Sequence, residues 1–184
     1  ALSNDATPTV VFTTGGAPAA IDCRVDAGAF APCTSPFSPT VADGAHTITV
    51  RVTDGANNSA TDTTASFTVD TIAPTVAITG EPAALSNDAT PTVAFTTAGA
   101  PTSTQCQVDA GALVSCSSPF TTSVGDGTHT ITVRVTDGAG NSSSATTGSF
   151  AVDTVAPTVT ITTEPSALSN DATPTVAFTT GGAP

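Results

Sequence analysis

The four cysteines of this 184-residue chain form two pairs with the same spacing. The sequence RVDAGAFAP separates Cys23 from Cys33, and QVDAGALVS separates Cys106 from Cys116. Each intervening sequence indicates a short strand, an Asp-Ala-Gly turn and a second short strand, which brings the two sulfur atoms together. We therefore predict the disulfides Cys23–Cys33 and Cys106–Cys116, formed in an oxidising compartment. A metal site would need more soft ligands than one cysteine pair and a distant histidine.

The two histidines, His46 and His129, are the residues that could act as general bases. Each is the first residue of the sequence HTITVRVT, two positions before an isoleucine that we expect to face inward. In a strand the histidine would lie on the same face as that isoleucine, so we expect it to cap the edge of a core. Catalysis would also require a positioned nucleophile and an orienting acid. Because the sequence has no phosphate-binding loop and no HExxH motif, we predict that the protein is not an enzyme.

Acidic turns at the ends of the expected strands offer oxygen ligands. If successive strands run alternately down and up, the turns of one domain meet the turn DGAGN (137–141) of the next at a junction. Calcium takes six to eight oxygen ligands, which makes these junctions candidate calcium sites. The candidate ligands are Asp5, Asp43 and Asp70 with Asp137 and Asn141 at the first junction, and Asp88, Asp126 and Asp153 at the second. The alternative is that these residues only form turns, and no Asp-x-Asp-x-Asp-Gly loop is present.

Two Asn-x-Ser triplets are formal acceptors for N-linked sugar. They begin at Asn57 and Asn141, in the same expected loop of successive repeats. Such triplets also arise by chance in a sequence rich in serine and threonine, so both explanations stay open.

An internal repeat must position all these residues. The sequence ALSNDATPTV begins at Ala1, at Ala84 and at Ala167, an offset of 83 residues each time (84 − 1 and 167 − 84). At that offset roughly 70% of the positions of the first two periods are identical, which indicates a tandem array.

Short alternating segments predict strands throughout the repeat, and no segment has a helical period. In the second period these strands cover 74–79, 91–97, 104–108, 112–116, 118–124, 129–136 and 146–152. We therefore predict an all-β fold of tandem immunoglobulin-like antiparallel sandwiches, with about seven strands per 83-residue repeat. The alternating valine, isoleucine and phenylalanine residues argue against disorder.

The domain frame is expected to differ from the repeat frame. The sequences VDTIAPT (69–75) and VDTVAPT (152–158) end one domain and begin the first strand of the next. Residues 1–71 would be a domain without its first strand, 72–154 a complete domain, and 155–184 the first two strands of a third. Because each linker is short, contains proline and has no glycine, we expect it to be stiff.

Composition excludes two classes of partner. The net charge of −12 would repel phosphate backbones, so we predict no nucleic-acid binding. No apolar run approaches the roughly 20 residues that a membrane helix needs.

Three sequence segments carry a family resemblance. The segments CRVDAGAFAPCTSPF, DGAHTITVRVTDGANNS and VDTIAPTV resemble the bacterial Ig-like repeats of large secreted and surface-anchored proteins. The resemblance implies an extracellular or cell-surface location and the stalk of an adhesin, biofilm protein or similar assembly. Related adhesin arrays often carry calcium at their junctions. The chain differs from antibody-type domains because it has no core tryptophan and no cysteine pair placed to bridge two sheets.

We predict that the repeats are structural spacers in an adhesin stalk, surface fibre or matrix protein, with neighbouring repeats as their partners. One alternative is a filament, in which identical chains join through strand edges or lateral contacts. Another is a sugar- or ice-binding module, suggested by rows of outward threonines. These rows are Thr130–Thr132 and Thr158–Thr160–Thr162.

Overall fold

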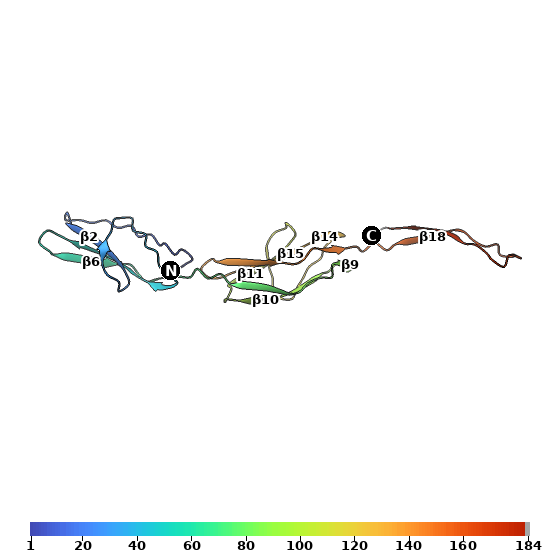
Figure 1. Cartoon of the computed structure of the whole chain (residues 1–184), viewed down its shortest axis with the longest axis horizontal. Coiled ribbons are helices and arrows are strands. Elements are labelled where there is room, and N and C mark those ends of the chain that lie inside the picture. Colours follow the sequence, from blue (N-terminus) through green and yellow to red (C-terminus); the bar gives the residue numbers. More distant parts are fainter. Residues whose placement is uncertain (183–184) are drawn as a thin grey trace. The chain divides into compact units, whose positions relative to one another are not determined.

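The computed structural model describes residues 1–182, and every regular element in that range is a strand (Figure 1). Repeats are counted from here on between the linkers, and not from ALSNDATPTV, because this keeps the strands of one sandwich together. The first repeat contains β1 (Leu2–Ser3), β2 (Ala20–Val25), β3 (Ala31–Pro32), β4 (Gly44–His46), β5 (Ile48–Thr53), β6 (Ser59–Thr63) and β7 (Phe67–Val69). The second contains β8 (Thr75–Gly80), β9 (Leu85–Ser86), β10 (Thr92–Ala98), β11 (Ser103–Val108), β12 (Val114–Ser115), β13 (Phe120–Thr121), β14 (Gly127–His129), β15 (Ile131–Thr136), β16 (Ser142–Thr146) and β17 (Phe150–Val152). The third contains β18 (Thr158–Thr163) and β19 (Ala177–Gly181).

Contacts divide the described chain into two units. The first consists of Ala1–Val76, Thr97–Thr104 and Arg134–Ser144, and the second of the other described residues. The boundary between the units therefore runs through the second repeat.

The first repeat folds into two sheets, with strand orders β3-β2-β5-β6 and β1-β7-β4. The longest pairing joins β2 to β5 in antiparallel register, from Ala20 opposite Thr53 to Val25 opposite Ile48. Strands β1 and β7 pair in parallel, whereas the other pairs in these sheets are antiparallel.

The second repeat has the corresponding sheets, β12-β11-β15-β16 and β14-β17-β9, and a further sheet, β13-β10-β8. In the first repeat, the segment that corresponds to β10 contributes one isolated bridge, between Val10 and Phe37. The first repeat therefore lacks this further sheet among the described residues.

Alternation along β15 builds the core of the second repeat. Ile131, Val133 and Val135 are fully buried, whereas Thr132, Arg134 and Thr136 are not. Ile131 packs in one cluster with the buried residues Val93, Phe150 and Val152, and Ile78 of β8 packs against that cluster. Successive side chains of a strand point to opposite faces, which is why this sequence has one apolar face.

The alternation of HTITVRVT predicts a single strand over residues 129–136. The structure instead divides this sequence between two strands. Its first part, β14, pairs with β17, and its second part, β15, belongs to the sheet of β11. The break falls at Thr130, whose backbone N–H donates to the carboxylate of Asp109 at 2.8 Å and not to a neighbouring strand. The chain therefore passes from one sheet to the other at this residue.

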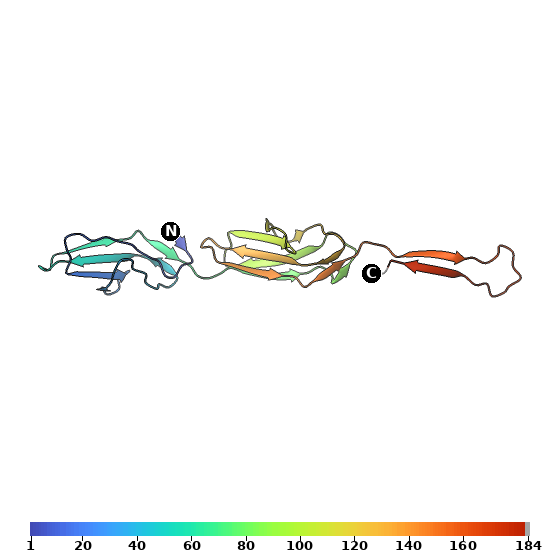
Figure 2. The same cartoon turned by 90° about the horizontal axis from the view of Figure 1, so that it is seen from above.

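The third repeat forms a two-stranded hairpin, in which β18 and β19 lie side by side (Figure 2). Its apolar side chains remain exposed, including Val159, Ile161 and Phe178. A two-stranded hairpin has no second layer to cover such residues, so this one has no core among the described residues.

The prediction of tandem immunoglobulin-like β-sandwiches is confirmed. Two details differ from it: β1 and β9 pair in parallel with β7 and β17, and the second repeat has ten strands where we predict about seven. The additional strands are short, or polar like β16 (SSSAT), so apolar alternation does not reveal them.

Candidate functional site

Each predicted disulfide is present in its hairpin. Cys23 in β2 is bonded to Cys33, and Cys106 in β11 to Cys116, with Cα atoms 5.6 and 5.7 Å apart. One partner of each pair is buried, so the bond lies at the edge of the core. Between the two strands the chain turns at an aspartate with positive φ, 51° in both repeats. Each bond therefore staples a turn that needs an unusual backbone conformation.

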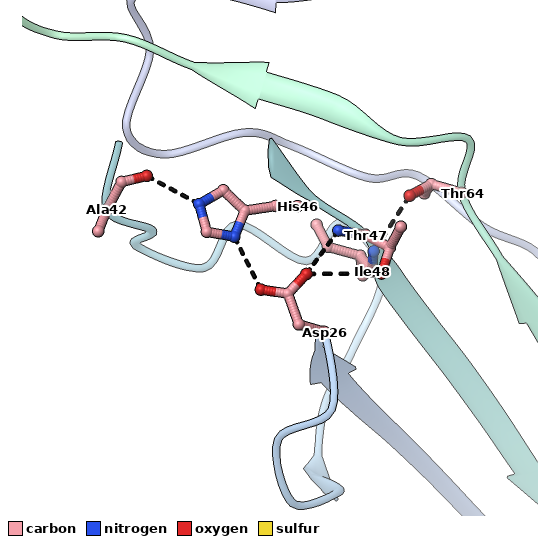
Figure 3. A network of polar contacts seen from close by, with 6 residues as sticks. All are labelled: Asp26, Ala42, His46, Thr47, Ile48 and Thr64. Atoms are coloured by element: carbon pink, nitrogen blue, oxygen red, sulfur yellow. Dashed lines mark hydrogen bonds and ion pairs between the residues drawn. The ribbon is translucent and has the colours of Figure 1, made fainter. Parts of the chain in front are cut away.

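The turn aspartate is joined to the histidine that ends a strand of the other sheet (Figure 3). In the first repeat, Asp26 Oδ2 lies 2.8 Å from His46 Nδ1, and Asp26 Oδ1 accepts the backbone N–H of Thr47 at 2.7 Å. His46 Nε2 lies 2.8 Å from the carbonyl oxygen of Ala42. The second repeat has the same arrangement with Asp109, His129, Thr130 and Gly125. This Asp–His pair fixes the hairpin against the place where the chain changes sheets.

Both ring nitrogens of each histidine face acceptors, a carboxylate and a carbonyl oxygen. The protonated ring can donate to both, because both nitrogens of an imidazolium carry hydrogen. Accordingly, the hydrogen bond with Asp26 raises the pKa of His46, and the bond with Ala42 adds to this. The hydrogen bond with His46 lowers the pKa of Asp26, and so does the N–H of Thr47.

The Asp–His pair does not have the geometry of a catalytic triad. In a triad the ring nitrogen remote from the aspartate accepts a proton from a nucleophile. Here that nitrogen is bonded to a backbone carbonyl oxygen, of Ala42 in one repeat and of Gly125 in the other. The sequence does contain a signal for the pair, since aspartate and histidine are 20 residues apart in both repeats, but our strand-parity argument did not use it.

Among residues 1–182, an arginine cluster occurs in the first repeat alone. The guanidinium carbons of Arg24 and Arg51 lie 4.6 and 4.1 Å from the ring centroid of Phe30, and Arg51 forms an ion pair with Asp22 at 2.8 Å. The second repeat has Gln105, Gln107 and Leu113 at three of these four positions. Sequence reasoning missed this cluster because the phenylalanine belongs to the turn and the arginines to two separate strands.

Several predicted calcium ligands hold the linkers instead. Asp43 Oδ1 accepts the N–H and the hydroxyl of Thr71, both at 2.9 Å, and Asp70 Oδ1 accepts the N–H of Ile72 at 3.1 Å. In the next repeat, Asp126 accepts from Thr154 and Asp153 from Val155 in the same way. The carboxylates therefore fix the first linker residues onto the domain that precedes them.

The other predicted ligands form turns. Asp5 and Asp88 each accept the N–H and hydroxyl of the threonine two residues later, which lowers the pKa of both carboxyls.

Asp137 and Asn141 are brought together in one turn. Asp137 Oδ1 accepts three backbone N–H groups of residues 139–141, and its Oδ2 accepts Asn141 Nδ2 at 2.9 Å. Asn141 Nδ2 also donates to the carbonyl oxygen of Asp70 at 2.7 Å, within the first unit.

No metal cluster is formed by these carboxylates in the structure as described. Within residues 1–182, no group of three or more histidine, cysteine, aspartate or glutamate side chains could hold a metal ion. The predicted aspartate ligands instead accept hydrogen bonds from backbone N–H groups, as Asp43 does from Thr71 and Asp137 from Asn141. Calcium at the junctions remains a prediction, without support from this geometry.

The two predicted glycosylation sites differ in their surroundings. Asn57 is exposed at a turn with φ of 67°. The amide nitrogen of Asn141, which would carry the sugar, is already bonded to Asp70 and Asp137. Asn57 is therefore the more accessible of the two.

The threonine rows are also unequal. Thr130 lies at the sheet change and Thr132 bonds the hydroxyl of Thr146 at 2.9 Å, so these two do not form a continuous row. Thr158, Thr160 and Thr162 do lie on one strand, β18, and are exposed. None of the described residues forms a helix of the length and hydropathy that a membrane crossing requires.

A family model described as the bacterial Ig-like domain matches residues 2–71 and 74–154. The chain belongs to this family, as the resemblance of its cysteine hairpins and linkers implies. Membership indicates a structural, non-catalytic module. Among solved structures, the chain is similar to the fibronectin(III)-like modules of Clostridium thermocellum CbhA, with 15% identity, a TM-score of 0.47, and coverage of 82% of this chain and 87% of that chain. No curated protein matches the sequence.

Proposed function

We propose that the repeats are structural spacers in an extracellular stalk, such as that of an adhesin, surface fibre or matrix protein. The observation that carries this proposal is the duplication of three structural devices at positions 83 residues apart. The disulfide, the Asp–His pair and the hydrogen bonds to the linker all occur in both repeats. A spacer needs each of its units to be held in the same way, whereas a unique active site would not need copying.

The mechanism that we propose is architectural. Each sandwich folds on its own core, its disulfide staples one hairpin, and the aspartates at its end hold the following linker. Two disulfides in a short acidic chain also suit a location outside the cell, because disulfides persist in oxidising compartments. Labelling intact cells of the source organism with an antibody against the chain tests the location. We expect surface labelling, and labelling that appears only after lysis would contradict it.

Small-angle scattering tests the role of the linker aspartates. We expect the double variant D43A/D126A to broaden the distribution of intramolecular distances, because the first linker residues lose their acceptors. The matched control is E81A/E164A, which also removes two carboxylates from positions 83 residues apart. This control removes none of the linker hydrogen bonds described above. If the two variants give the same distance distribution, the aspartates do not stiffen the linker.

A self-assembled filament is the second candidate function. It is favoured by the edge strand β6, whose five residues are all exposed, because an exposed strand edge can pair with another chain. Electron microscopy at several protein concentrations separates the two functions, since filament length depends on concentration and an isolated spacer does not grow.

A further inference from the structure

The arginine cluster of the first repeat gathers positive charge on an acidic chain. The sequence has three arginines and no lysine against 15 acids. Two of the three, Arg24 and Arg51, meet at the ring of Phe30. Asp22 pairs with Arg51 at 2.8 Å. Two guanidinium groups face one carboxylate, so one positive charge of the cluster is unbalanced.

The cluster also lacks hydrogen-bond acceptors. The Nε atoms of Arg24 and Arg51 are buried and have no hydrogen-bond partner within residues 1–182. Arg51 donates to Asp22 through a terminal nitrogen, whereas Arg24 has no acceptor in that range. The ring of Phe30 interacts with the guanidinium groups through its π-system, and N–H groups at the edge of each guanidinium plane remain as donors. The cluster is therefore short of an anionic acceptor.

The fold does not require this cluster. The second repeat forms the same disulfide hairpin and the same Asp–His pair without it. There, glutamine or leucine occupies three of the four positions, as Gln105, Gln107 and Leu113. The fourth position holds Arg134, the counterpart of Arg51. The devices that hold the sandwich are duplicated, whereas this one is not, so its role lies outside the fold.

The cluster lies on the sheet face that points away from the core. Arg24 and Asp22 flank the buried Cys23 in β2, and neighbouring residues of a strand point to opposite faces. Strand β5 places Arg51 opposite Asp22, and β6 places the exposed Thr61 opposite Arg51. Residues opposite each other in paired strands share a face. The side chain of Arg51 is 36% exposed, so a ligand can reach it.

We propose that this face binds the carboxylate of an acidic sugar, a uronic acid in an otherwise neutral polysaccharide. A guanidinium group binds a carboxylate through two parallel N–H···O bonds, and Arg24 supplies the donors. The hydroxyls of Thr61 and Thr63, both exposed on the same face of β6, suit the hydroxyls of the sugar. Phe30 already contacts both guanidinium groups, so little freedom is lost on binding.

Other anionic partners fit this face less well. Strands β2 and β5 are each paired on both sides, so the face offers a peptide no unpaired strand edge. A densely charged polyanion would be repelled by the net charge of −12. A mostly neutral polysaccharide avoids both difficulties. Binding of this kind goes beyond the spacer role, which holds whether or not the first repeat binds a sugar.

NMR titration of the whole chain with methyl glucuronide, which carries one carboxylate, tests the proposal. The matched ligand is methyl glucoside, which has a hydroxymethyl group in its place. The three arginines give three Nε–H signals, and burial slows the exchange of those of Arg24 and Arg51 with water. We expect methyl glucuronide to move these two signals and to leave that of Arg134 unchanged. Methyl glucoside should move none of them.

Substitutions separate the cluster from general charge effects. R24Q should weaken binding by about tenfold or more, because the carboxylate loses charge-assisted hydrogen bonds. The matched control is R134Q, which removes the same charge from the second repeat and should bind like wild type. The triple variant Q105D/Q107R/L113F rebuilds the cluster around Arg134, so it should raise the number of binding sites from one to two.

Four results would overturn the proposal: no movement of the Arg24 and Arg51 signals, an equal response to methyl glucoside, equal weakening by R24Q and R134Q, or a single site in the rebuilt variant. Binding of N-acetylglutamate amide as strong as that of methyl glucuronide would also overturn it, because the face would then suit an acidic peptide and not a sugar. None of these results bears on the spacer role, which scattering tests separately.

Discussion

Asp26 Oδ2 lies 2.8 Å from His46 Nδ1, and the same atoms of Asp109 and His129 lie at the same distance in the second repeat. The pair joins the tip of the disulfide hairpin to the residue before the change of sheet. The histidine ring also lies near a core phenylalanine, with centroids 6.0 Å apart for Phe67 and 5.9 Å apart for Phe150. A charged pair and an apolar contact therefore meet at the same side chain.

Stability should depend on pH through this pair. The pKa of both histidines is raised above 6.5, so their contribution is complete below about pH 6.5 and is lost as the pH rises through the higher folded-state pKa. The pKa of Asp26 and Asp109 is lowered below 3.8, so their contribution is present above that value and is lost as the pH falls through the lower folded-state pKa. We expect the denaturant midpoint to be higher at pH 5.5 than at pH 8.5.

The double variant H46Q/H129Q is the control for this dependence. Glutamine keeps a polar side chain but cannot gain a proton, so the difference between the two pH values should shrink. An unchanged difference would show that other groups cause it.

Removal of the second disulfide should destabilise the second repeat. The bond closes a loop between residues that are 10 apart, and C106S/C116S should lower the free energy of unfolding by about 3 kcal/mol through loop entropy. Denaturant unfolding of the whole chain measures this loss. Mass mapping of a non-reduced digest checks the pairing, and a Cys23–Cys106 peptide would contradict it.

The same substitution should cost different amounts in the two repeats. Val133→Ala removes two buried methyl groups and leaves a cavity, which should cost about 2 kcal/mol of folding stability. Val50→Ala, at the equivalent half-buried position, should cost less than half as much in the monomer. Denaturant curves compare the two, and equal costs would mean that Val50 is as well buried in solution as Val133.

The domain frame stays a prediction that two fragments can test. Residues 72–154 carry β8 and the strands around it. Residues 1–83 carry β8 at the wrong end and leave an apolar groove open beside Val50 and Val52. We expect 72–154 to melt at the higher temperature although both fragments have 83 residues. A melting temperature of 1–83 equal to or above that of 72–154 would make our frame wrong.

Local patterns were enough to predict much of this fold. Alternation identifies β15 through Ile131, Val133 and Val135, and the two cysteines ten residues apart identify each hairpin. These features depend on neighbouring residues in the sequence. Strand β16 was not predicted, because a polar strand is defined by its pairing with β15 and not by its own composition.

The polar contacts were harder to predict because they depend on distant segments. The carboxylate of Asp26 reaches His46 only after the turn adopts positive φ and the two sheets have packed. The acids that we predict as calcium ligands lie between strands, but their hydrogen-bond partners can be distant, since Asp43 accepts from Thr71, 28 residues away. The sequence shows how many carboxylate oxygens are available to a metal ion. It does not show which of these oxygens already accept hydrogen bonds from backbone N–H groups.

Force spectroscopy of the whole chain, held at its two ends, tests the central claim that the repeats are independent structural spacers. We predict a cooperative force peak for the unfolding of the second repeat, and a gain of about 30 Å in the length released after reduction. The disulfide hides 10 residues at 3.3–3.6 Å per residue, less the 5.7 Å between Cα atoms that the bond already spans. Gradual extension without a force peak, or the same released length before and after reduction, would contradict the account.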